Sequence, residues 1–334
     1  TGHFGKWHLG SVQKGSPVNP VASGFDHWFS APNFFDNDPI LSREGVAVQT
    51  QGESSMVTVD AALEFITDQA EKGQPFLALV WFGSPHSPHE AADEDRALYP
   101  DVPSDVQNFY GEISGMDRAV GKLREELRRL GIHRNSILWY CSDNGGLPGL
   151  GSTGGRGHKG DIYQGGLRVP AVLEWPDRIP APRVTDFPAG TVDIYPTLLE
   201  LVGSASREGV PLDGTSLAPL LEGNMPERPA PLGFWNHPTP GIRTPSAEWM
   251  AELLQAQSER RDTTGPERLR LDAGEIKRRY PDDTFPGHSA WLDWPWKLHR
   301  IEDEAGAVRL ELYQLIEDPG EETDRSFEEA ERVE

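Results

Sequence analysis

The sequence contains a single cysteine, Cys141, and no run of 18 or more apolar residues. One cysteine excludes an intramolecular disulfide and any zinc site built from several cysteines. The lack of a long apolar run argues against a membrane-spanning helix. Basic residues are also few, because 31 Lys and Arg stand against 53 Asp and Glu. The resulting formal net charge of −22 opposes nonspecific binding to nucleic acid.

The length of 334 residues suits two domains, or one large domain with a satellite, and 37% hydrophobic content can fill a sizeable core. The first residue is Thr1, with neither an initiating methionine nor a signal peptide before it. We therefore expect a fragment that is cut at its amino end.

The most informative stretch runs from Asn135 to Pro170. Its apolar run, residues 137–141, is short and rich in aromatics, which predicts a buried parallel strand with Cys141 as an inert core residue. The run ends in Asp143 and Asn144, followed by two glycines. A carboxylate beside an amide carbonyl suits Ca²⁺ or Mg²⁺ and suits Zn²⁺ poorly. The same four residues are also good turn formers, so a plain turn is the alternative.

A glycine-rich loop follows and carries Lys159 between small neighbours, where an ammonium can approach a bound anion closely. The alternative is a flexible surface lysine. Behind it, residues 163–170 lead into another apolar run, residues 171–175, which predicts a second strand. Two strands whose polar loops meet at one edge favour a binding site there.

An earlier apolar run, residues 75–82, predicts a strand with the loop Ser-Pro-His-Ser-Pro-His at its carboxyl end. Prolines stiffen this loop, which makes His86 a site candidate, although a loop histidine can also be merely exposed. A helical stripe follows over residues 106–130. Strand, helix and strand then form a βαβ unit with parallel pairing, which brings the His86 and Asp143 loops to one edge.

Near the start, Lys6 and His8 stand two residues apart. In an extended segment both point to one side, while Trp7 and Leu9 point to the other and can be buried. Two cationic groups can then face one anion, although an exposed lysine and a core-edge histidine would explain the pattern equally well. Residues 11–52 show no clear periodicity and predict irregular surface, within which a short strand could begin at residues 24–26. Thr58 is the expected N-cap of a helix that ends before Gly73.

Proline is dense from residue 222 to residue 241, which suits a linker. Residues 291–315 alternate in polarity and predict a hairpin that turns at Glu304, Ala305 and Gly306. We therefore divide the chain into a catalytic-type α/β domain, residues 1–221, and a linker with a small antiparallel subdomain, residues 222–334. Trp235, His237 and His288 could shape a pocket or simply pack.

Several of these segments, taken in order, resemble the type I sulfatases of the alkaline phosphatase superfamily. The resemblance covers nearly the whole chain and depends on the joint order of GKWHLG, SPHSPH, YGEISGMDRAV, SDNGG, KGDIYQGGLRVP, VDIYPTLLELVG, LDGTSLAPLLEG and ELYQLIEDPGEETD. It implies an α/β fold with a doubly wound, mostly parallel sheet and a small carboxyl-terminal antiparallel α+β subdomain.

The resemblance also implies roles for individual residues. Lys6 and His8 would stabilise and deprotonate the nucleophile, and His86 would contact the sulfate and serve as a proton donor. Lys159 would also bind the sulfate, while Asp143 and Asn144 would hold Ca²⁺ rather than Mg²⁺. One departure is Gln164, where the family commonly has glutamate.

Family members hydrolyse sulfate esters with a formylglycine made from a Cys- or Ser-x-Pro/Ala-x-Arg motif, and two early carboxylates complete the calcium site. This sequence contains neither the motif nor the carboxylate pair. We therefore expect the 334 residues alone to be inactive, and the intact protein to be a sulfuric ester hydrolase for a sulfated carbohydrate or an aryl sulfate. It would need a formylglycine-generating or maturase enzyme, and it would be periplasmic or extracellular by family habit.

Two alternatives stay open. A phosphodiesterase-type member of the superfamily would use two transition metals, but those sites generally have histidine where this chain has Asn144. A non-catalytic protein that binds sulfate or glycans, or the product of a decayed gene, would never have possessed the nucleophile.

Overall fold

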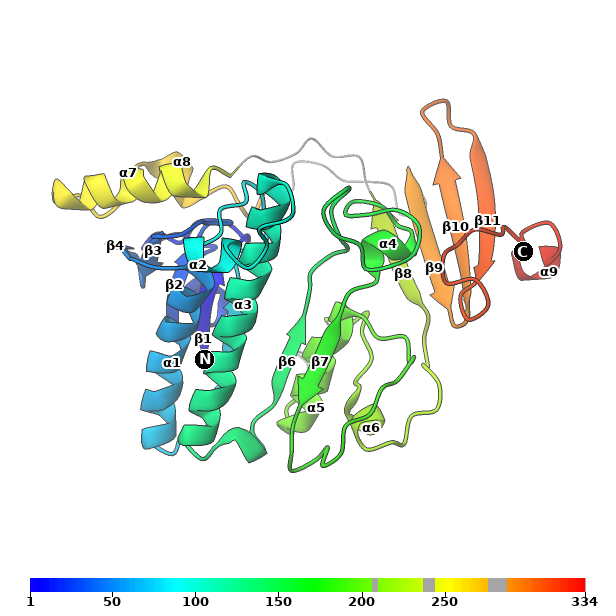
Figure 1. Cartoon of the computed structure of the whole chain (residues 1–334), viewed down its shortest axis with the longest axis horizontal. Coiled ribbons are helices and arrows are strands. Elements are labelled where there is room, and N and C mark those ends of the chain that lie inside the picture. Colours follow the sequence, from blue (N-terminus) through cyan, green and yellow to red (C-terminus); the bar gives the residue numbers. More distant parts are fainter. Residues whose placement is uncertain (206–209, 237–243, 276–286, 334) are drawn as a thin grey trace. The chain divides into compact units, whose positions relative to one another are not determined.

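The computed structural model describes residues 1–205, 210–236, 244–275 and 287–333. It divides into two compact units (Figure 1). The first comprises Thr1–His133 with Gly241–Arg279, and the second comprises Arg134–Pro240 with Tyr280–Glu334. The predicted division at residues 221 and 222 stays a prediction.

The first unit is built on a five-stranded sheet in the order β4-β3-β2-β1-β5. Strand β1 lies between β2 and β5 and is parallel to both, whereas β3 and β4 continue the sheet in antiparallel fashion. The bounds are β1 Gly2–Lys6, β2 His27–Ala31, β3 Ile40–Arg43, β4 Val46–Gln49 and β5 Ala78–Trp81. The prediction of irregular surface over residues 11–52 is therefore wrong, since three strands of this sheet lie there.

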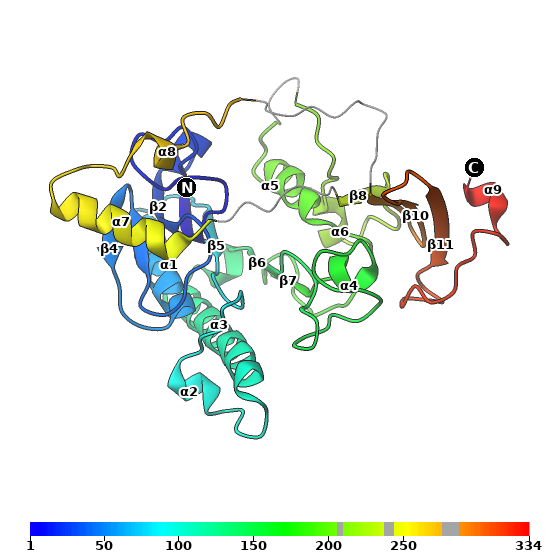
Figure 2. The same cartoon turned by 90° about the horizontal axis from the view of Figure 1, so that it is seen from above.

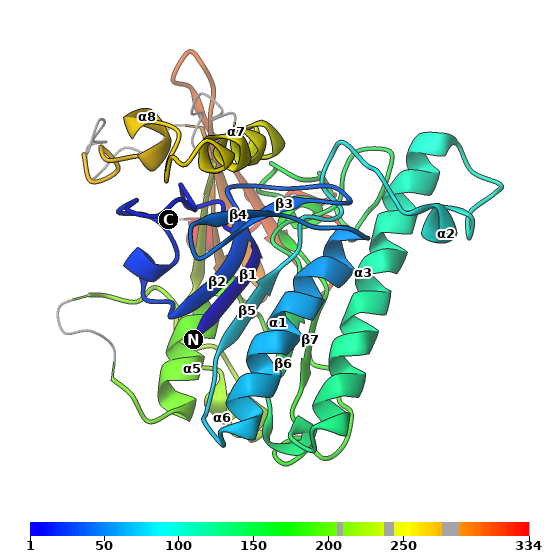
Figure 3. The same ribbon diagram turned by 90° about the vertical axis from the view of Figure 1, so that its left-hand side faces the viewer.

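Two long helices, α1 (Ser54–Glu71) and α3 (Ser104–Arg129), pack against each other, and α1 also contacts β1 and β5 (Figure 3). The N-cap of α1 is Glu53, whose carboxylate accepts hydrogen bonds from the backbone N–H groups of Ser55 and Met56. The predicted cap, Thr58, lies inside the helix, where its hydroxyl donates to Ser54 O. The short helix α2 (Asp93–Arg96) packs against α3.

Helix α7 (Ser246–Ser258) returns to the first unit and contacts β3 and β4 (Figure 2). Its buried side chains, Met250 and Leu253, join Trp7, Val12 and Ala47 in one apolar cluster. Burial of this face ties the chain after residue 244 to the sheet. The short helices η1 (Val21–Ser23) and α8 (Pro266–Leu269) complete the described elements of this unit.

The second unit begins within η2 (His133–Asn135) and continues with β6 (Leu138–Cys141), which pairs antiparallel with β7 (Ala171–Glu174). Both predicted strands are present, but the prediction that the first is buried and parallel is wrong, because β6 is half-buried and its described partner β7 is antiparallel. The predicted parallel pairing of the strand before His86 with the strand before Asp143 is not found among the described residues, because β5 pairs with β1 and β6 pairs with β7. The helices here are α4 (Gln164–Leu167), η3 (Thr191–Asp193), α5 (Ile194–Leu201) and α6 (Ala218–Leu221).

A four-stranded antiparallel sheet in the order β11-β10-β9-β8 completes the second unit, with α9 (Ala330–Val333) near its end. Its strands are β8 Leu232–Asn236, β9 His288–Asp293, β10 Trp296–Glu302 and β11 Val308–Gln314. The predicted turn between residues 303 and 307 is confirmed. The fold is thus α/β, with a mixed sheet and the expected carboxyl-terminal antiparallel sheet. Among the described residues, no helix is long and apolar enough to cross a membrane.

Candidate active site

The first group of predicted site residues gathers at the carboxyl edge of the five-stranded sheet. Lys6 ends β1, and its neighbour strand β5 ends at Trp81, which is paired with Gly5. Because parallel strands end at the same edge, the segments that carry Lys6, His8 and His86 all leave from this edge. The fold therefore gives these three residues a common location within the first unit.

The segment after β1 turns sharply. Trp7 N and His8 N still donate to Ala31 O and Pro32 O, but His8 has φ = 54°, in the left-handed region that is uncommon for residues other than glycine. Trp7 is buried and its indole Nε1 donates to Val18 O, whereas Leu9 is 60% exposed. The prediction of a simple extended segment with both apolar residues buried is thus correct for Trp7 only. The turn leaves the His8 residue exposed at the sheet edge.

His86 lies on the loop after β5, and its ring stacks on Phe34 at 4.2 Å between centroids with 13° between planes. Its Nδ1 is 2.8 Å from Ser87 O, and because a carbonyl oxygen can only accept, Nδ1–H is the donor of this hydrogen bond. At the other end of the loop, the hydroxyl of Ser84 lies 3.2 Å from that of Ser54 at the start of α1. The ring orientation of His86 is therefore set by stacking and by its own loop.

The second group of predicted residues lies in the second unit, around the start of β7. Cys141 at the end of β6 is paired with Ala171 at the start of β7, so the Asp143 loop and the segment that enters β7 share one edge. Two backbone hydrogen bonds join them: Gly145 N donates to Gly166 O, and Lys159 N donates to Gly146 O, both at 2.9 Å. The predicted meeting of these two loops is confirmed.

Glycines are required where these loops touch. A Cβ on Gly145 would lie 1.9 Å from Gly165 O, and a Cβ on Gly165 would lie 2.1 Å from Gly157 O. Gly166 is equally tight against Asp161 O. No side chain can occupy such space without moving backbone. The glycine pairs thus serve close packing of two backbones rather than flexibility.

Asp143 is exposed and Asn144 is half-buried, with its Nδ2 donating to Gly145 O at 2.9 Å. Within the described residues, no group of three or more His, Cys, Asp or Glu side chains lies in an arrangement that could hold a metal ion. The hard oxygens of these two neighbours fit Ca²⁺ or Mg²⁺ in kind, but they form an incomplete set of ligands. Burial and the nearby Asp143 raise the pKa of the Cys141 thiol, which agrees with an inert cysteine.

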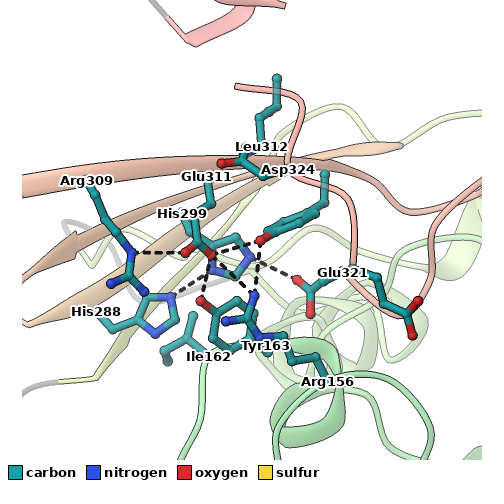
Figure 4. A network of polar contacts seen from close by, with 12 residues as sticks. Arg156, Ile162, Tyr163, His288, His299, Arg309, Glu311, Leu312, Glu321 and Asp324 are labelled. Atoms are coloured by element: carbon teal, nitrogen blue, oxygen red, sulfur yellow. Dashed lines mark hydrogen bonds and ion pairs between the residues drawn. The ribbon is translucent and has the colours of Figure 1, made fainter. Parts of the chain in front are cut away.

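A buried network of charged and polar side chains, which the sequence did not predict, holds the Lys159 loop in place (Figure 4). Lys297 on β10 donates from Nζ to Ile162 O at 2.7 Å and to Glu321 Oε1 at 2.8 Å. The other oxygen of Glu321 accepts from Gln164 N at 2.5 Å. Backbone atoms on both sides of Tyr163 are therefore held by a single ion pair whose side chains expose no surface.

His299 and His288 extend this network along the sheet. His299 Nε2 lies 2.9 Å from Glu321 Oε1, and its Nδ1 lies 2.8 Å from His288 Nε2. Burial lowers the pKa of both imidazoles, that of His288 to about 4. Two features of the sequence could have pointed to this network: Lys297 is a lysine inside an alternating strand, and Glu321 lies in an acidic stretch.

Tyr163 itself is fixed by a second set of contacts on the same face. Its hydroxyl donates to Glu311 Oε2 at 2.6 Å, and Arg156 lies 3.9 Å above its ring. Burial, aided by the bond to Glu311, raises the Tyr163 pKa to about 12, so the phenol stays a donor. Burial would raise the pKa of Glu311, but hydrogen bonds from Tyr163, Tyr313 and Arg309 outweigh it and lower that pKa.

Strand β8 also supports the Lys159 loop, because Asn236 at its end donates from Nδ2 to Gly160 O at 2.8 Å. Trp235 is half-exposed, His288 belongs to the network above, and His237 lies outside the described residues. Lys6, His8 and His86 belong to the first unit, whereas Asp143, Asn144 and Lys159 belong to the second.

Comparison with known proteins places the chain in a family. Residues 1–204 match the sulfatase family model. N-acetylgalactosamine-6-sulfatase of Canis lupus familiaris is 30% identical over 258 residues, which are 67% of this chain and 47% of that protein. An ulvan-active sulfatase of Formosa agariphila is 27% identical over 278 residues, covering 73% of this chain and 53% of that protein.

Solved structures show the same fold. The crystal structure of Ps i-CgsB in complex with k-i-k-neocarrahexaose has a TM-score of 0.78 at 23% identity and covers all of this chain and 68% of that chain. PsFucS1 sulfatase from Pseudoalteromonas sp. has a TM-score of 0.67 at 19% identity, with 98% and 66% covered. The chain spans about half the length of the curated relatives it matches. Since the family model covers more than half of its length, the chain belongs to the sulfatase family.

Proposed function

We propose that the intact protein is a sulfatase that hydrolyses a sulfate ester of a glycan. The observation that carries the proposal is the pair of backbone hydrogen bonds that joins the Lys159 loop to the Asp143–Asn144 loop, in a chain of the sulfatase family. These bonds hold the backbone of Lys159 against the loop that carries the hard oxygens of Asp143 and Asn144, which supports a site for an anion bound beside a cation. A glycan is favoured because several relatives are named for glycan substrates.

Asp143 and Asn144 would hold Ca²⁺ together with further carboxylates that lie outside this sequence. The ion would neutralise charge on the sulfate oxygens, and a formylglycine would supply the nucleophile. Within this chain, Lys159 would bind a sulfate oxygen through Nζ, and the glycine backbone around it allows close approach. Lys6 would stabilise the nucleophile with its positive charge, and His8 would deprotonate it. His86, with Nδ1–H held by Ser87 O, would donate a proton from Nε2 of the protonated imidazole to the leaving oxygen.

The proposal is tested on the full-length protein, produced together with a formylglycine-generating enzyme. Release of sulfate is measured from a panel of sulfated glycans and an aryl sulfate. We expect turnover of at least one sulfated sugar, and Lys159→Ala should lower kcat/KM by about 100-fold or more, as expected for loss of one transition-state charge contact. Lys72→Ala is the control, because Lys72 forms only an exposed ion pair with Asp68.

Three results would contradict the proposal. They are turnover of phosphate diesters in preference to sulfate esters, binding of sulfated sugars without turnover, and unchanged kcat/KM in Lys159→Ala. The 334-residue chain alone should release no sulfate, because it lacks the formylglycine motif.

A further inference from the structure

The loop that carries His86 is held at its far end by side chains from helix α3. Glu112 Oε1 accepts a hydrogen bond from Glu90 N at 2.6 Å, and Asn108 Oδ1 accepts from Ala91 N at 3.2 Å. On the opposite side, Asn37 Nδ2 donates to Glu90 O at 2.9 Å. Three side chains therefore fix the backbone four and five residues after His86.

The other carboxyl oxygen of Glu112 faces an imidazole. Glu112 Oε2 lies 3.6 Å from His89 Nδ1, and the two side chains are only 5% and 10% exposed. Within the described part of the chain, neither atom has a hydrogen-bond partner. Phe109 meets the His89 ring edge-on at 5.1 Å between centroids, which limits the ring's rotation. A single proton between Oε2 and Nδ1, with a small shortening of the contact, would satisfy both atoms.

The surrounding charges decide which partner carries that proton. The charges that act on Glu112 come from Asp36 after β2, Glu53 at the start of α1 and Glu90 on the loop, and the charge of Asp105 on α3 acts on His89. Arg118 on α3 forms its ion pairs with Asp95 and Glu94. A second ionised carboxylate in this acidic surrounding would be unfavourable.

Burial shifts the pKa values of both groups in the directions that these charges favour. Burial raises the pKa of Glu112 to about 8, and the charges of Asp36, Glu53 and Glu90 act in the same direction, against the hydrogen bond from Glu90 N. Burial lowers the pKa of His89, although Asp105 opposes this. At neutral pH the proton therefore lies on Glu112, and the imidazole of His89 is neutral.

We propose that Glu112 is a positioning residue that holds the His86 loop as a neutral carboxylic acid, donating Oε2–H to His89 Nδ1 while Oε1 accepts from Glu90 N. Ionisation of Glu112 strengthens the bond from Glu90 N, but it removes the donor to His89 and adds a charge beside Asp36, Glu53 and Glu90, and we expect this repulsion to release the loop end. The significance of this for catalysis rests on the proposed role of His86. The hydrogen-bonded arrangement itself does not depend on sulfatase activity.

Two substitutions separate this role from simple packing. Glu112→Gln keeps an acceptor for Glu90 N and supplies a permanent N–H donor for His89, whereas Glu112→Ala supplies neither. Glu125→Gln, on an exposed position of the same helix, is the matched control. Infrared difference spectra between about pH 6 and about pH 9 should contain a protonated-carboxyl band that Glu112→Gln lacks and Glu125→Gln keeps.

Amide hydrogen exchange at Glu90 and Ala91, corrected for intrinsic rates, gives the second readout. In the wild type we expect protection to fall about 10-fold as the pH passes about 8, while Glu112→Gln stays protected throughout and Glu112→Ala is unprotected throughout. Absence of the carboxyl band from the wild type, or equal loss of protection in the Gln and Ala variants, would overturn the proposal.

Activity of the full-length protein completes the test. The wild type should lose kcat above about pH 8 with little change in KM, and Glu112→Gln should remove this alkaline loss. If no sulfate ester is hydrolysed at all, the proposed function fails while the infrared and exchange results still decide the role of Glu112. If activity is present and both variants share the wild-type pH profile, the positioning role fails alone.

Discussion

Glu321 Oε1 lies 2.8 Å from Lys297 Nζ and 2.9 Å from His299 Nε2, and none of the three side chains exposes any surface. Such a buried pair gains little over an apolar pair of similar shape, because both charges lose their hydration. The pair matters here because it fixes backbone atoms: Lys297 also binds Ile162 O, and Glu321 also binds Gln164 N. The pair thus connects the carboxyl-terminal sheet to the Lys159 loop.

Removing one partner of this pair should destabilise the protein strongly. Lys297→Met leaves Glu321 buried without its cation, which should cost about 3–5 kcal/mol of unfolding free energy. The double variant Lys297→Met/Glu321→Gln should cost less than the two single changes added together, because no uncompensated charge remains. Urea titrations of the four proteins measure this coupling, with Lys72→Met as the exposed control. Simple additivity would argue against a coupled pair.

The Asp143 and Lys159 loops pack so closely that a methyl group should not fit between their backbones. Gly145→Ala places a Cβ 1.9 Å from Gly165 O, so the Asp143 and Lys159 loops must separate. We expect at least about a 10-fold lower kcat/KM for sulfate release by the full-length protein, since small displacements of catalytic groups are costly. Gly121→Ala is the control, because nothing lies within 4 Å of that position on α3.

The two glycine variants should also differ in the sign of their stability change. Replacing a glycine inside a helix with alanine stabilises it by about 0.5–1 kcal/mol, so Gly121→Ala should raise the melting temperature while Gly145→Ala lowers it. A Gly145→Ala protein with wild-type activity and stability would show that the loops do not need their observed contact.

His3 should make the protein sensitive to acid. It lies fully buried in β1, where burial lowers its pKa from 6.5 to about 3. The unfolded chain therefore takes up a proton between pH 6.5 and about pH 3 that the native state does not, so stability falls as the pH drops through this window. The slope from one such group is at most about 1.4 kcal/mol per pH unit.

His3→Phe removes this proton and keeps an aromatic ring among Trp7, Phe25 and Trp81. Ser30, which lies 2.7 Å from His3 Nδ1, retains its hydrogen bond to the backbone carbonyl of residue 3. The difference in unfolding free energy between wild type and variant should change across the window. His27→Gln, at an exposed position, is the comparison. A constant difference from neutral pH to pH 3 would mean that His3 does not titrate as described.

Removal of metal should inactivate the full-length protein, if Asp143 and Asn144 act as proposed. Treatment with a chelator should abolish sulfate release, and Ca²⁺ should restore it better than Zn²⁺, because the donors are hard oxygens. Asp143→Ala should weaken the restoration, so that higher Ca²⁺ concentrations are needed. Metal analysis that finds Zn²⁺ or Mn²⁺ as the bound ion, or activity that survives chelation, would contradict this assignment.

Local patterns predicted part of the fold correctly. The apolar runs before Asp143 and after Arg168 are strands, and the long amphipathic stripe is α3. The N-cap of α1 was predicted five residues too late. The side chains of Glu53 and Thr58 can both accept hydrogen bonds from backbone N–H groups, and in the structure Glu53 is the one that accepts two at the helix start. Strands β3 and β4 were missed because neither lies in a sustained apolar run such as the one that marks β5.

Only glycine fits where two backbones touch, and the sequence alone determines the glycine-rich segment around Lys159. The same holds for the stiff loop around His86 and for the excess of acidic charge. Tertiary structure alone decided which strands pair, so β5 joins β1 and β6 joins β7 instead of each other. It also decided that Glu321 meets Lys297 and that Glu112 meets His89. Contacts between side chains 23 and 24 residues apart depend on the three-dimensional packing of whole elements, which no local period encodes.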